Sequence, residues 1–233
     1  GLVTSAMTTN IISLIGLFSR NLQVFFNIEE EKPNSRKQFE KYFHSLKNFD
    51  EIHVLIIGLG NIGISLAKNL TLLGAKVDGI SKKEKNLKFI NKQFTLNKIK
   101  NELHKYDFVI SLLPENNSTI DILNYDFFKS LSKNTIFINA GRGSTCKESD
   151  LLKSLDEGFP KFAILDVLKN EPLSVEKQIY KHPKTFITPH IFAFSPSYWP
   201  KEIELFKYNL KIYLKKDFRR MKNIEISNEN LFT

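Results

Sequence analysis

One stretch constrains the fold of this chain more than any other: the aliphatic run Val54-Leu-Ile-Ile57, which leads directly into Gly58-Leu-Gly60-Asn-Ile-Gly63. Four consecutive aliphatic residues are typical of a strand that is buried on both faces. In the loop, Gly58 would permit a tight turn, Gly60 would let the backbone approach a pyrophosphate, and Gly63 would let the next helix pack closely. The stretch therefore predicts a strand, a dinucleotide-binding loop and a helix, in that order.

The residues after the loop favour dinucleotide binding over an ordinary strand turn, which glycines at this spacing can also make. The run from Ile64 to Leu73 has a helical pattern, and it ends at Gly74, where a glycine is common after a helix. The free amides of the first turn, at Asn61 and Ile62, would face the anionic cofactor.

Composition limits the cellular context and the partners. One cysteine, Cys146, excludes an internal disulfide, and we expect a cytoplasmic protein. The net charge is +9, but the basic residues are spread along the chain, often in pairs such as Lys215-Lys216, with no dense tract. We therefore expect no nucleic-acid partner and no metal site, and we attribute the charge to a lysine-rich surface and an anion-binding site.

The N-terminal region predicts a helix and no membrane segment. The apolar run from Ile11 to Phe18 is too short to span a bilayer, and no basic residue precedes it. Apolar residues at three- and four-residue steps predict one long amphipathic helix: Met7, Ile11, Leu14, Ile15, Phe18, Leu22 and Phe25. Residues 36–50, which follow Pro33, could form a short helix or an irregular connection.

From Ile52 onward, apolar runs alternate with helical patterns, which predicts a doubly wound α/β fold: a parallel sheet with helices on both faces. The expected strands are residues 53–57, 76–80, 106–113, 135–139, 162–167 and 185–188. A polar or Pro/Gly feature follows each strand, and ligands bind at that edge in open α/β sheets. A last helix is expected from Pro200 to Leu214, followed by a basic tail.

Three ionisable side chains follow successive strands and could form a reductase site beside a nicotinamide ring. Arg142 lies between two glycines, and a planar guanidinium suits the bidentate recognition of a 2-keto acid. Glu171 precedes Pro172, and His190 follows Thr188-Pro189. Each residue alone would fit a structural role, but the combination favours chemistry.

These residues resemble the D-isomer-specific 2-hydroxyacid dehydrogenase family over most of the chain. Besides the glycine loop, the matching motifs are Leu112-Leu-Pro114, Ile138-Asn-Ala-Gly-Arg-Gly143 with Glu148 and Asp150-Leu, Leu165-Asp-Val-Leu-Lys-Asn-Glu-Pro-Leu173, and Ile187-Thr-Pro-His-Ile191. They occur in the family's order and at compatible spacing. The stretch Phe194-Ser-Pro-Ser-Tyr-Trp199 is similar to the branch that contains glyoxylate and hydroxypyruvate reductases.

The resemblance implies an oxidoreductase that transfers a hydride from NAD(P)H to a small 2-keto acid and gives the D-2-hydroxy acid. Arg142 would hold the keto acid, His190 would protonate the carbonyl oxygen, and Glu171 would orient His190 and favour the imidazolium. The resemblance also implies cofactor contacts from Leu113, Pro114, Ala140 and Gly141. Asp166 matches the family's aspartate near the nicotinamide carboxamide, although it could equally be a structural carboxylate at a strand end.

The end of the second expected strand predicts the choice of cofactor. An NAD-selective site usually places Asp or Glu there, about twenty residues after the loop. Here the residues are Ser81-Lys82-Lys83, which would bind a 2′-phosphate, so we expect NADPH to be preferred over NADH. If the register differed by a few residues, Asp78 could be the ribose-binding acid and NADH would be preferred.

The sequence departs from the family before the glycine loop, where most of the substrate-binding lobe is expected. We expect residues 1–50 to be an interdomain helix and connector, 51–192 the Rossmann NAD(P)-binding domain, and 193–233 a helix and tail that return to the substrate domain. The terminal helices would then be a remnant of that domain, with apolar faces buried against the missing lobe or the second subunit of a homodimer. A non-catalytic dinucleotide-binding or redox-sensing module, or an inactive fragment, is the alternative.

Overall fold

Seven parallel strands form one sheet at the centre of the structure, a computed structural model that describes residues 2–26, 32–83, 85–95, 99–172 and 177–223. The strands are β1 (His53–Ile57), β2 (Lys76–Ile80), β3 (Lys92–Phe94), β4 (Phe108–Ser111), β5 (Ile136–Asn139), β6 (Phe162–Leu165) and β7 (Thr185–Ile187). Their order is β3-β2-β1-β4-β5-β6-β7. The chain runs outward from β1 to β3 and then returns to the other side of β1 with β4, so the switch in strand order lies between β1 and β4. The predicted doubly wound parallel sheet is confirmed.

The predicted strands agree closely with the observed strands, with one addition. β1 and β2 have the predicted bounds, and the other four predicted strands are shorter by one to four residues. The additional strand, β3, pairs only with β2 at the sheet edge. Its sequence, Lys92-Gln-Phe94, has no apolar run, which explains why the pattern does not reveal it.

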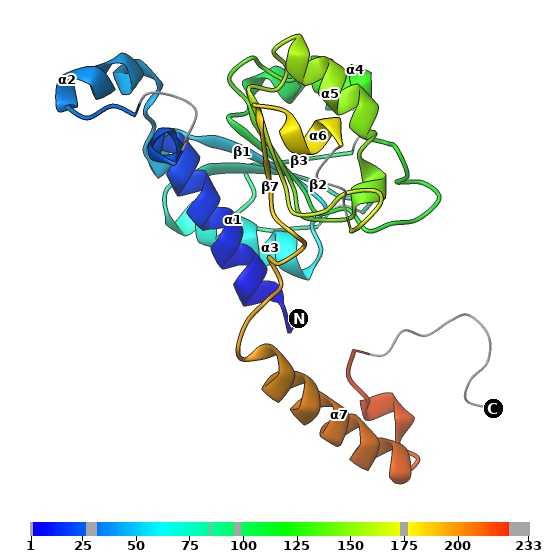
Figure 1. The fold of residues 1–233 in the computed structure, drawn as a ribbon. Coiled ribbons are helices and arrows are strands. Elements are labelled where there is room, and N and C mark those ends of the chain that lie inside the picture. Colours follow the sequence, from blue (N-terminus) through cyan, green and yellow to red (C-terminus); the bar gives the residue numbers. More distant parts are fainter. Residues whose placement is uncertain (1, 27–31, 84, 96–98, 173–176, 224–233) are drawn as a thin grey trace. The chain divides into compact units, whose positions relative to one another are not determined.

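Helices cover both faces of the sheet, as predicted (Figure 1). α1 (Thr4–Ser19) and α3 (Asn61–Leu72) lie on one face, and α4 (Tyr125–Lys129), α5 (Glu148–Asp156) and α6 (Gln178–Lys181) lie on the other. Alternate residues of β1 supply the two cores: Val54 and Ile56 pack on the side of α1 and α3, whereas Leu55 and Ile57 pack on the side of α4 and α5. The β1 run is therefore buried on both faces because helices cover both.

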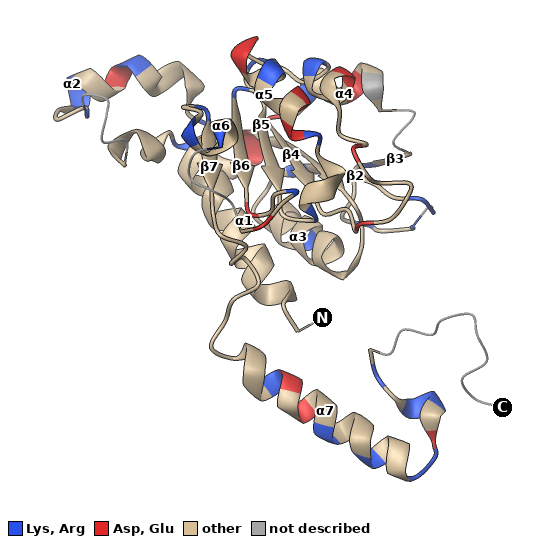
Figure 2. Cartoon of the chain, turned by 45° about the vertical axis from the view of Figure 1, so that its right-hand side comes forward, with Lys and Arg blue, Asp and Glu red and all other residues tan. Residues whose placement is uncertain are grey.

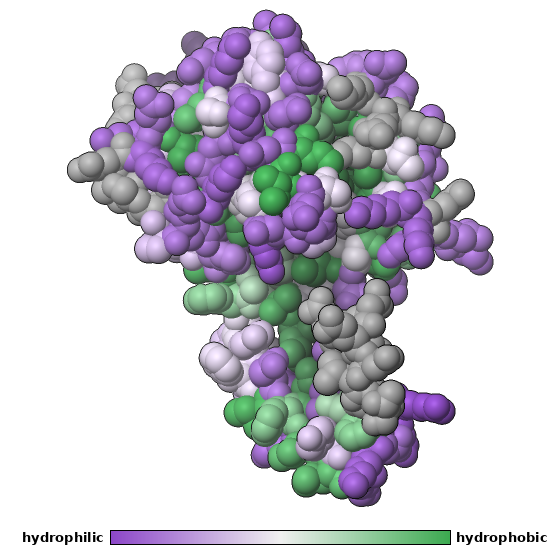
Figure 3. Space-filling model, turned by 90° about the vertical axis from the view of Figure 1, so that its right-hand side faces the viewer, coloured by the Kyte–Doolittle hydropathy of each residue, from purple (hydrophilic) through white to green (hydrophobic). Residues whose placement is uncertain are grey.

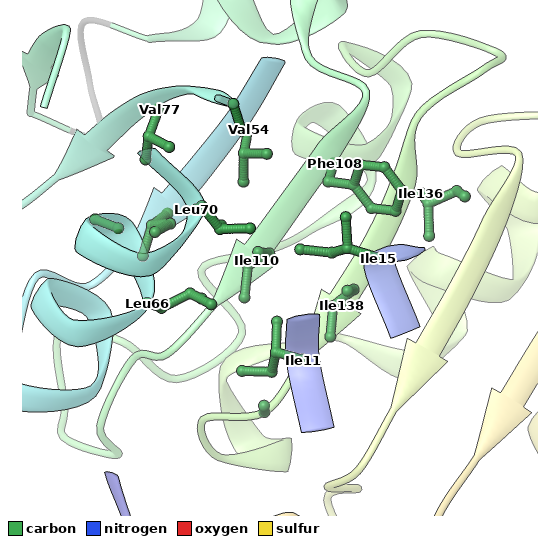
Figure 4. Packing of buried hydrophobic residues seen from close by; sticks show 14 of the residues in the cluster. Ile11, Ile15, Val54, Leu66, Leu70, Val77, Phe108, Ile110, Ile136 and Ile138 are labelled. Atoms are coloured by element: carbon green, nitrogen blue, oxygen red, sulfur yellow. The ribbon is translucent and has the colours of Figure 1, made fainter. Parts of the chain in front are cut away.

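The first helix is shorter than predicted, and its apolar face has a different partner. α1 ends at Ser19, and Asn21 adopts a left-handed conformation with φ 51°, so Leu22–Phe25 form a separate 3-10 helix, η1. Ile11 and Ile15 are fully buried against α3 and the sheet (Figure 4). The expectation that this face needs another lobe or subunit to cover it is therefore wrong for the part up to Phe18, which the sheet and α3 cover, whereas Leu22 and Phe25 at its end are exposed.

The segment between α1 and the sheet consists of short helical turns, so the two alternatives left open for it are both partly correct. Its elements are α2 (Arg36–Phe39) and the 3-10 helices η2 (Glu40–Ser45) and η3 (Phe49–Glu51). A further 3-10 helix, η5 (Lys100–Lys105), precedes β4. Ser35 caps α2 by accepting a hydrogen bond from the Gln38 amide at 3.3 Å.

Residues from 194 onward form a second compact unit that contains the predicted last helix, α7 (Tyr198–Leu214). One stripe of α7 carries exposed apolar and aromatic side chains at four- and three-residue steps: Trp199, Ile203, Phe206, Leu210 and Tyr213. Hydrophobic side chains reach the surface of this unit (Figure 3). The chain then turns through η7 (Phe218–Arg220), and the backbone of Lys222 exchanges two hydrogen bonds with the Asn209 side chain. Basic residues lie along α7 as well as on the loops of the sheet unit, as the dispersed lysines in the sequence predicted (Figure 2).

Candidate active site

The glycine loop has the conformation that its spacing predicts. Gly58 has φ 109°, a left-handed conformation that favours glycine, and a Cβ there would lie 2.9 Å from the Leu112 carbonyl oxygen. A Cβ on Gly63 would overlap the Gly58 carbonyl, so α3 packs against the loop without a side chain between them. By contrast, a Cβ on Gly60 would meet nothing within 4 Å, so this side of the loop is open to a ligand.

The start of α3 supplies amides for a phosphate group. Asn61 is the first residue of this helix, and no side chain caps it. The amides of Asn61, Ile62 and Gly63 therefore lie at the positive end of the helix without a capping acceptor. An open backbone at Gly60 beside uncapped amides fits a pyrophosphate.

Asp78 is not available for a ribose, which resolves the question of register. It lies in the middle of β2, opposite Leu55 of β1 and Lys92 of β3, and is 2% exposed. Its carboxylate accepts hydrogen bonds from the Tyr106 hydroxyl, the Asn91 amide group and the Lys92 backbone amide at 2.7–2.9 Å, and contacts His53 Nε2 at 2.9 Å. His53 and Lys92 lie on the two neighbouring strands, and Asn91 and Tyr106 lie just before β3 and β4.

These contacts determine the protonation of Asp78. Burial raises the pKa of its carboxyl, but the hydrogen bonds from His53, Asn91 and Tyr106 outweigh this effect and hold the pKa below its ordinary value. Asp78 is therefore a carboxylate that serves the fold.

The residues at the end of β2 are Ser81, Lys82 and Lys83. The Ser81 hydroxyl donates to the Lys83 carbonyl oxygen at 2.6 Å, and Lys82 Nζ donates to the Ser118 hydroxyl at 3.2 Å, across the loop that follows β4. Lys85 Nζ donates to the Leu59 carbonyl oxygen of the glycine loop at 2.6 Å. Lys85 was not among the predicted cofactor-binding residues, although its position two residues after Lys83 in the same charged loop could have indicated it.

The loop after β5 presents Arg142 to solvent. The Arg142 side chain is exposed, and its Nη1 donates to the Gly141 carbonyl oxygen at 2.8 Å. Among the described residues it forms no ion pair with a carboxylate, so the guanidinium keeps donors for an anionic ligand. A Cβ on Gly141 would lie 2.5 Å from the Leu113 carbonyl oxygen, so this loop packs directly on the Leu113-Pro114 loop. Ala140, which precedes Gly141, is buried.

His190 and Glu171 form the histidine–carboxylate pair that the sequence predicted. His190 Nδ1 lies 2.7 Å from Glu171 Oε2, and both side chains are partly exposed. The other carboxylate oxygen of Glu171 accepts a hydrogen bond from the Leu168 amide at 2.7 Å. Within the described part of the chain, His190 Nε2 has no hydrogen-bond partner, so it is the ring nitrogen that could meet a substrate.

Asp166 anchors the loop that carries His190. Its buried carboxylate accepts hydrogen bonds from the Thr188 hydroxyl at 2.7 Å and from the Ile191 and Phe192 amides at 2.9 and 3.1 Å. These donors lie on both sides of His190, which has a left-handed φ of 58°. Of the two interpretations left open for Asp166, these contacts support the structural carboxylate, and its contact with a nicotinamide stays a prediction.

The structure thus places the predicted residues on loops at one edge of the sheet, where the carboxyl ends of parallel strands meet. The loop after β5 and the loop after β6 are also held together by Gly143 and Glu148, which were not predicted as site residues. A Cβ on Gly143 would overlap the Leu168 carbonyl group, and Glu148 Oε1 accepts a hydrogen bond from the Lys169 amide at 2.7 Å. Their contact partners lie more than twenty residues away in sequence, so only the position of Glu148 in a family motif could have drawn attention to it.

Two further features of the described residues concern metal ligands and the single thiol. The described residues contain no cluster of His, Cys, Asp or Glu that could hold a metal ion. Cys146 is buried, and burial raises the pKa of its thiol, so the thiol is protonated at neutral pH. No helix in the described ranges combines the length and hydrophobicity needed to cross a membrane.

Known proteins resemble this chain in sequence and in structure. Glyoxylate/hydroxypyruvate reductase A of Salmonella typhi is 33% identical over 144 residues, which cover 62% of this chain and 46% of that protein. An NADPH-dependent glyoxylate/hydroxypyruvate reductase from Sinorhizobium meliloti, solved with NADP and sulfate, superposes with a TM-score of 0.77 at 27% identity and covers 92% of this chain and 66% of its own. A family protein from Aeromonas salmonicida, at 24% identity and a TM-score of 0.79, shares the fold. The chain spans about half the length of the curated relatives that it matches.

The family assignment depends on the sheet unit. Residues 20–191 match the domain described as D-isomer specific 2-hydroxyacid dehydrogenase, NAD binding domain, which confirms the family that the motifs indicated. The matched region contains the glycine loop and the loops of Arg142, Glu171 and His190. The chain therefore belongs to the D-isomer specific 2-hydroxyacid dehydrogenase family, of which it carries the NAD-binding domain.

Proposed function

We propose that this chain supplies the NADPH-binding and proton-donating half of a reductase that converts a small 2-keto acid to the D-2-hydroxy acid. Glyoxylate and hydroxypyruvate are the substrates we expect, because relatives with these names are 32–33% identical to the chain. The observation that carries the proposal is the His190–Glu171 pair at 2.7 Å, on the same sheet edge as the open glycine loop.

Four residues at the carboxyl edge of the sheet have a role in the proposed reaction. Arg142, which has no carboxylate partner among the described residues, binds the carboxylate of the keto acid. His190 donates a proton from Nε2 to the carbonyl oxygen, and Glu171 holds the ring through Nδ1. The nicotinamide ring supplies the hydride when the dinucleotide is bound. Asp166 keeps the His190 loop in place through its three hydrogen bonds.

Three basic side chains support a preference for NADPH. Lys82, Lys83 and Lys85 follow β2, and Lys85 contacts the glycine loop itself. A carboxylate at this position would repel a 2′-phosphate, but Asp78, the nearest preceding acid, is turned into the fold. The Sinorhizobium meliloti relative, described as NADPH-dependent and solved with NADP, supports the use of NADP(H).

The domain boundaries and the assembly also remain proposals. We infer that residues 51–192 are the cofactor domain and that residues 1–50 and 193–233 connect it to a substrate-binding domain. The exposed stripe of α7 would be covered by that domain or by a second subunit. A homodimer and a cytoplasmic location stay predictions.

The cofactor preference can be tested by removing two positive charges from the loop after β2. Lys82→Ala with Lys83→Ala should raise the KM for NADPH by about 10- to 100-fold and leave the KM for NADH within about twofold, since these two exposed lysines share one phosphate group and together contribute about as much as one charge-assisted contact, about 1.5–3 kcal/mol. Lys76→Ala is the matched control, because it removes a lysine from the opposite end of the same strand. Equal use of NADH and NADPH by the unmodified protein would contradict the preference.

The reaction itself is tested with the complete gene product. We expect NADPH to be oxidised when glyoxylate or hydroxypyruvate is present and not when both are omitted. NADPH binding without turnover of any small 2-keto acid would instead favour the non-catalytic dinucleotide-binding module.

A further inference from the structure

The backbone of Leu168 and Lys169 lies between the loop of Arg142 and the side chain of Glu171. On one side, the Leu168 amide donates to Glu171 Oε1 at 2.7 Å, and Glu171 Oε2 lies 2.7 Å from His190 Nδ1. The orientation of the imidazole therefore depends on where this short segment lies. Anything that displaces its backbone would displace Glu171 as well.

Gly143 holds the segment from the side of the Arg142 loop. A Cβ at this position would overlap the carbonyl carbon and oxygen of Leu168 and would lie 2.5 Å from the Lys169 amide nitrogen. All three atoms belong to the backbone, so no side chain could rotate away to make room. Gly143 begins the 3-10 helix η6 (Gly143–Thr145) and is not left-handed, so close approach, and not backbone conformation, requires a glycine here.

Glu148 holds the same segment from the start of α5. Its Oε1 accepts a hydrogen bond from the Lys169 amide at 2.7 Å, and the side chain is half-buried. Lys169 has one more anchor, because its Nζ lies 3.0 Å from Asp121. The segment is thus fixed at consecutive backbone groups by Gly143, Glu148 and Glu171.

We propose that Gly143 and Glu148 are positioning residues that set the geometry of the Glu171–His190 pair through the Leu168–Lys169 backbone. Neither residue needs to touch the substrate. The close contact at Gly143 also fixes the distance between the loop of Arg142, which would hold the keto acid, and the pair that would protonate it. This inference rests on the proposed function only for its effect on turnover.

Nuclear magnetic resonance of the His190 ring tests the inference without any turnover. The ring ¹⁵N signals of the chain labelled at histidine are assigned by their loss in His190→Ala, and Glu171→Gln gives the Nδ1 shift of a ring without its carboxylate. We expect Glu148→Ala, which removes the acceptor of the Lys169 amide, to move the Nδ1 shift at least halfway towards that value. Asp150→Ala is the matched control, since Asp150 also lies on α5 and accepts a backbone hydrogen bond, from Tyr125 at 3.0 Å, but holds a different segment.

A Glu148→Ala spectrum identical to that of the unmodified chain would overturn the inference, and so would an equal change in Asp150→Ala. If the protein reduces no keto acid, the proposed function fails, but this spectral result still decides the positioning role. If it is an active reductase and the spectrum does not change, only the positioning role fails.

Kinetics of the active protein provide a second test, with Gly143→Ala. We expect kcat to fall by about 10- to 100-fold, as for an active-site displacement near 1 Å, while the dissociation constant of NADPH stays within about twofold. In a Glu171→Gln background the same change should cost less than about threefold, because the group that Gly143 positions is already lost. Full additivity of the two substitutions would contradict a role that acts through Glu171.

Discussion

Two histidine–carboxylate pairs in this molecule have nearly the same contact distance and opposite surroundings. His53 Nε2 lies 2.9 Å from Asp78, and His190 Nδ1 lies 2.7 Å from Glu171. The Asp78 side chain is 3% exposed and the His53 side chain 18%, whereas Glu171 and His190 are 33% and 47% exposed. The first pair lies within the sheet, and the second lies on loops at its carboxyl edge.

The difference shows that the contact itself does not define a site. Asp78 receives three further hydrogen bonds, from Asn91, Lys92 and Tyr106, so its carboxylate is satisfied by the fold. Glu171 receives one, from Leu168, and the far nitrogen of His190 has no partner among the described residues. A pair with unused hydrogen-bonding capacity at a ligand-binding edge can act on a substrate. A buried pair whose hydrogen-bonding groups are all occupied by the protein can only stabilise the fold.

The largest effect is expected for the buried pair. Asp78→Ala leaves His53, Asn91 and Tyr106 without their acceptor and should lower the free energy of unfolding by about 3–5 kcal/mol, as for other broken buried pairs. Urea unfolding followed by circular dichroism measures this change. A loss below about 1 kcal/mol would mean that the network contributes little, and the contrast between the two pairs would fail.

An intermediate effect is expected for the exposed pair. Glu171→Gln should reduce kcat by about 10- to 100-fold, because an amide orients the imidazole less well and does not stabilise its charged form. It should change the free energy of unfolding by less than about 1 kcal/mol, as for an exposed pair. Steady-state kinetics and urea unfolding of the same preparation give both values. A large loss of stability with unchanged kcat would reverse the assignment.

The smallest effect is a difference in acid sensitivity. The folded-state pKa of Asp78 is lowered, so its carboxylate contributes stability above the unfolded value of about 3.9, and this contribution is lost as the pH falls through the folded value. The stability of the unmodified chain should therefore fall more steeply below about pH 4 than that of Asp78→Asn. Unfolding curves measured at several pH values test this, and parallel curves would contradict it.

The sequence predicted the features that depend on neighbouring residues. The β1 run and its glycine loop are local patterns, and β1 and β2 begin and end where predicted. The polar residues after each strand were correctly expected at one edge, because a parallel sheet brings all of its carboxyl ends together. The convergence of Arg142, Glu171 and His190 could therefore be expected from the strands, whereas the pairing of Glu171 with His190 was implied by the resemblance to the family.

Features that depend on contacts between residues far apart in sequence could not be predicted from local patterns. The partners of Asp78 come from three separate segments, so nothing near residue 78 shows that the carboxylate is already satisfied. The end of α1 at Ser19 was missed because the apolar spacing continues past Asn21, whose left-handed conformation leaves no mark in the pattern. The contacts of Gly143 and Glu148 with the Leu168–Lys169 segment were missed because they join loops of different strands.

The most direct test compares the two histidines in the complete gene product. The turnover of glyoxylate with NADPH is measured per folded molecule for His190→Ala and His53→Ala, with the folded fraction taken from circular dichroism. We predict that His190→Ala loses about 10²- to 10⁴-fold in kcat, the usual contribution of a general acid, while His53→Ala retains kcat within about threefold and loses stability. Wild-type turnover by His190→Ala, or an equal loss of kcat in both variants, would contradict the assignment of the chemistry to His190.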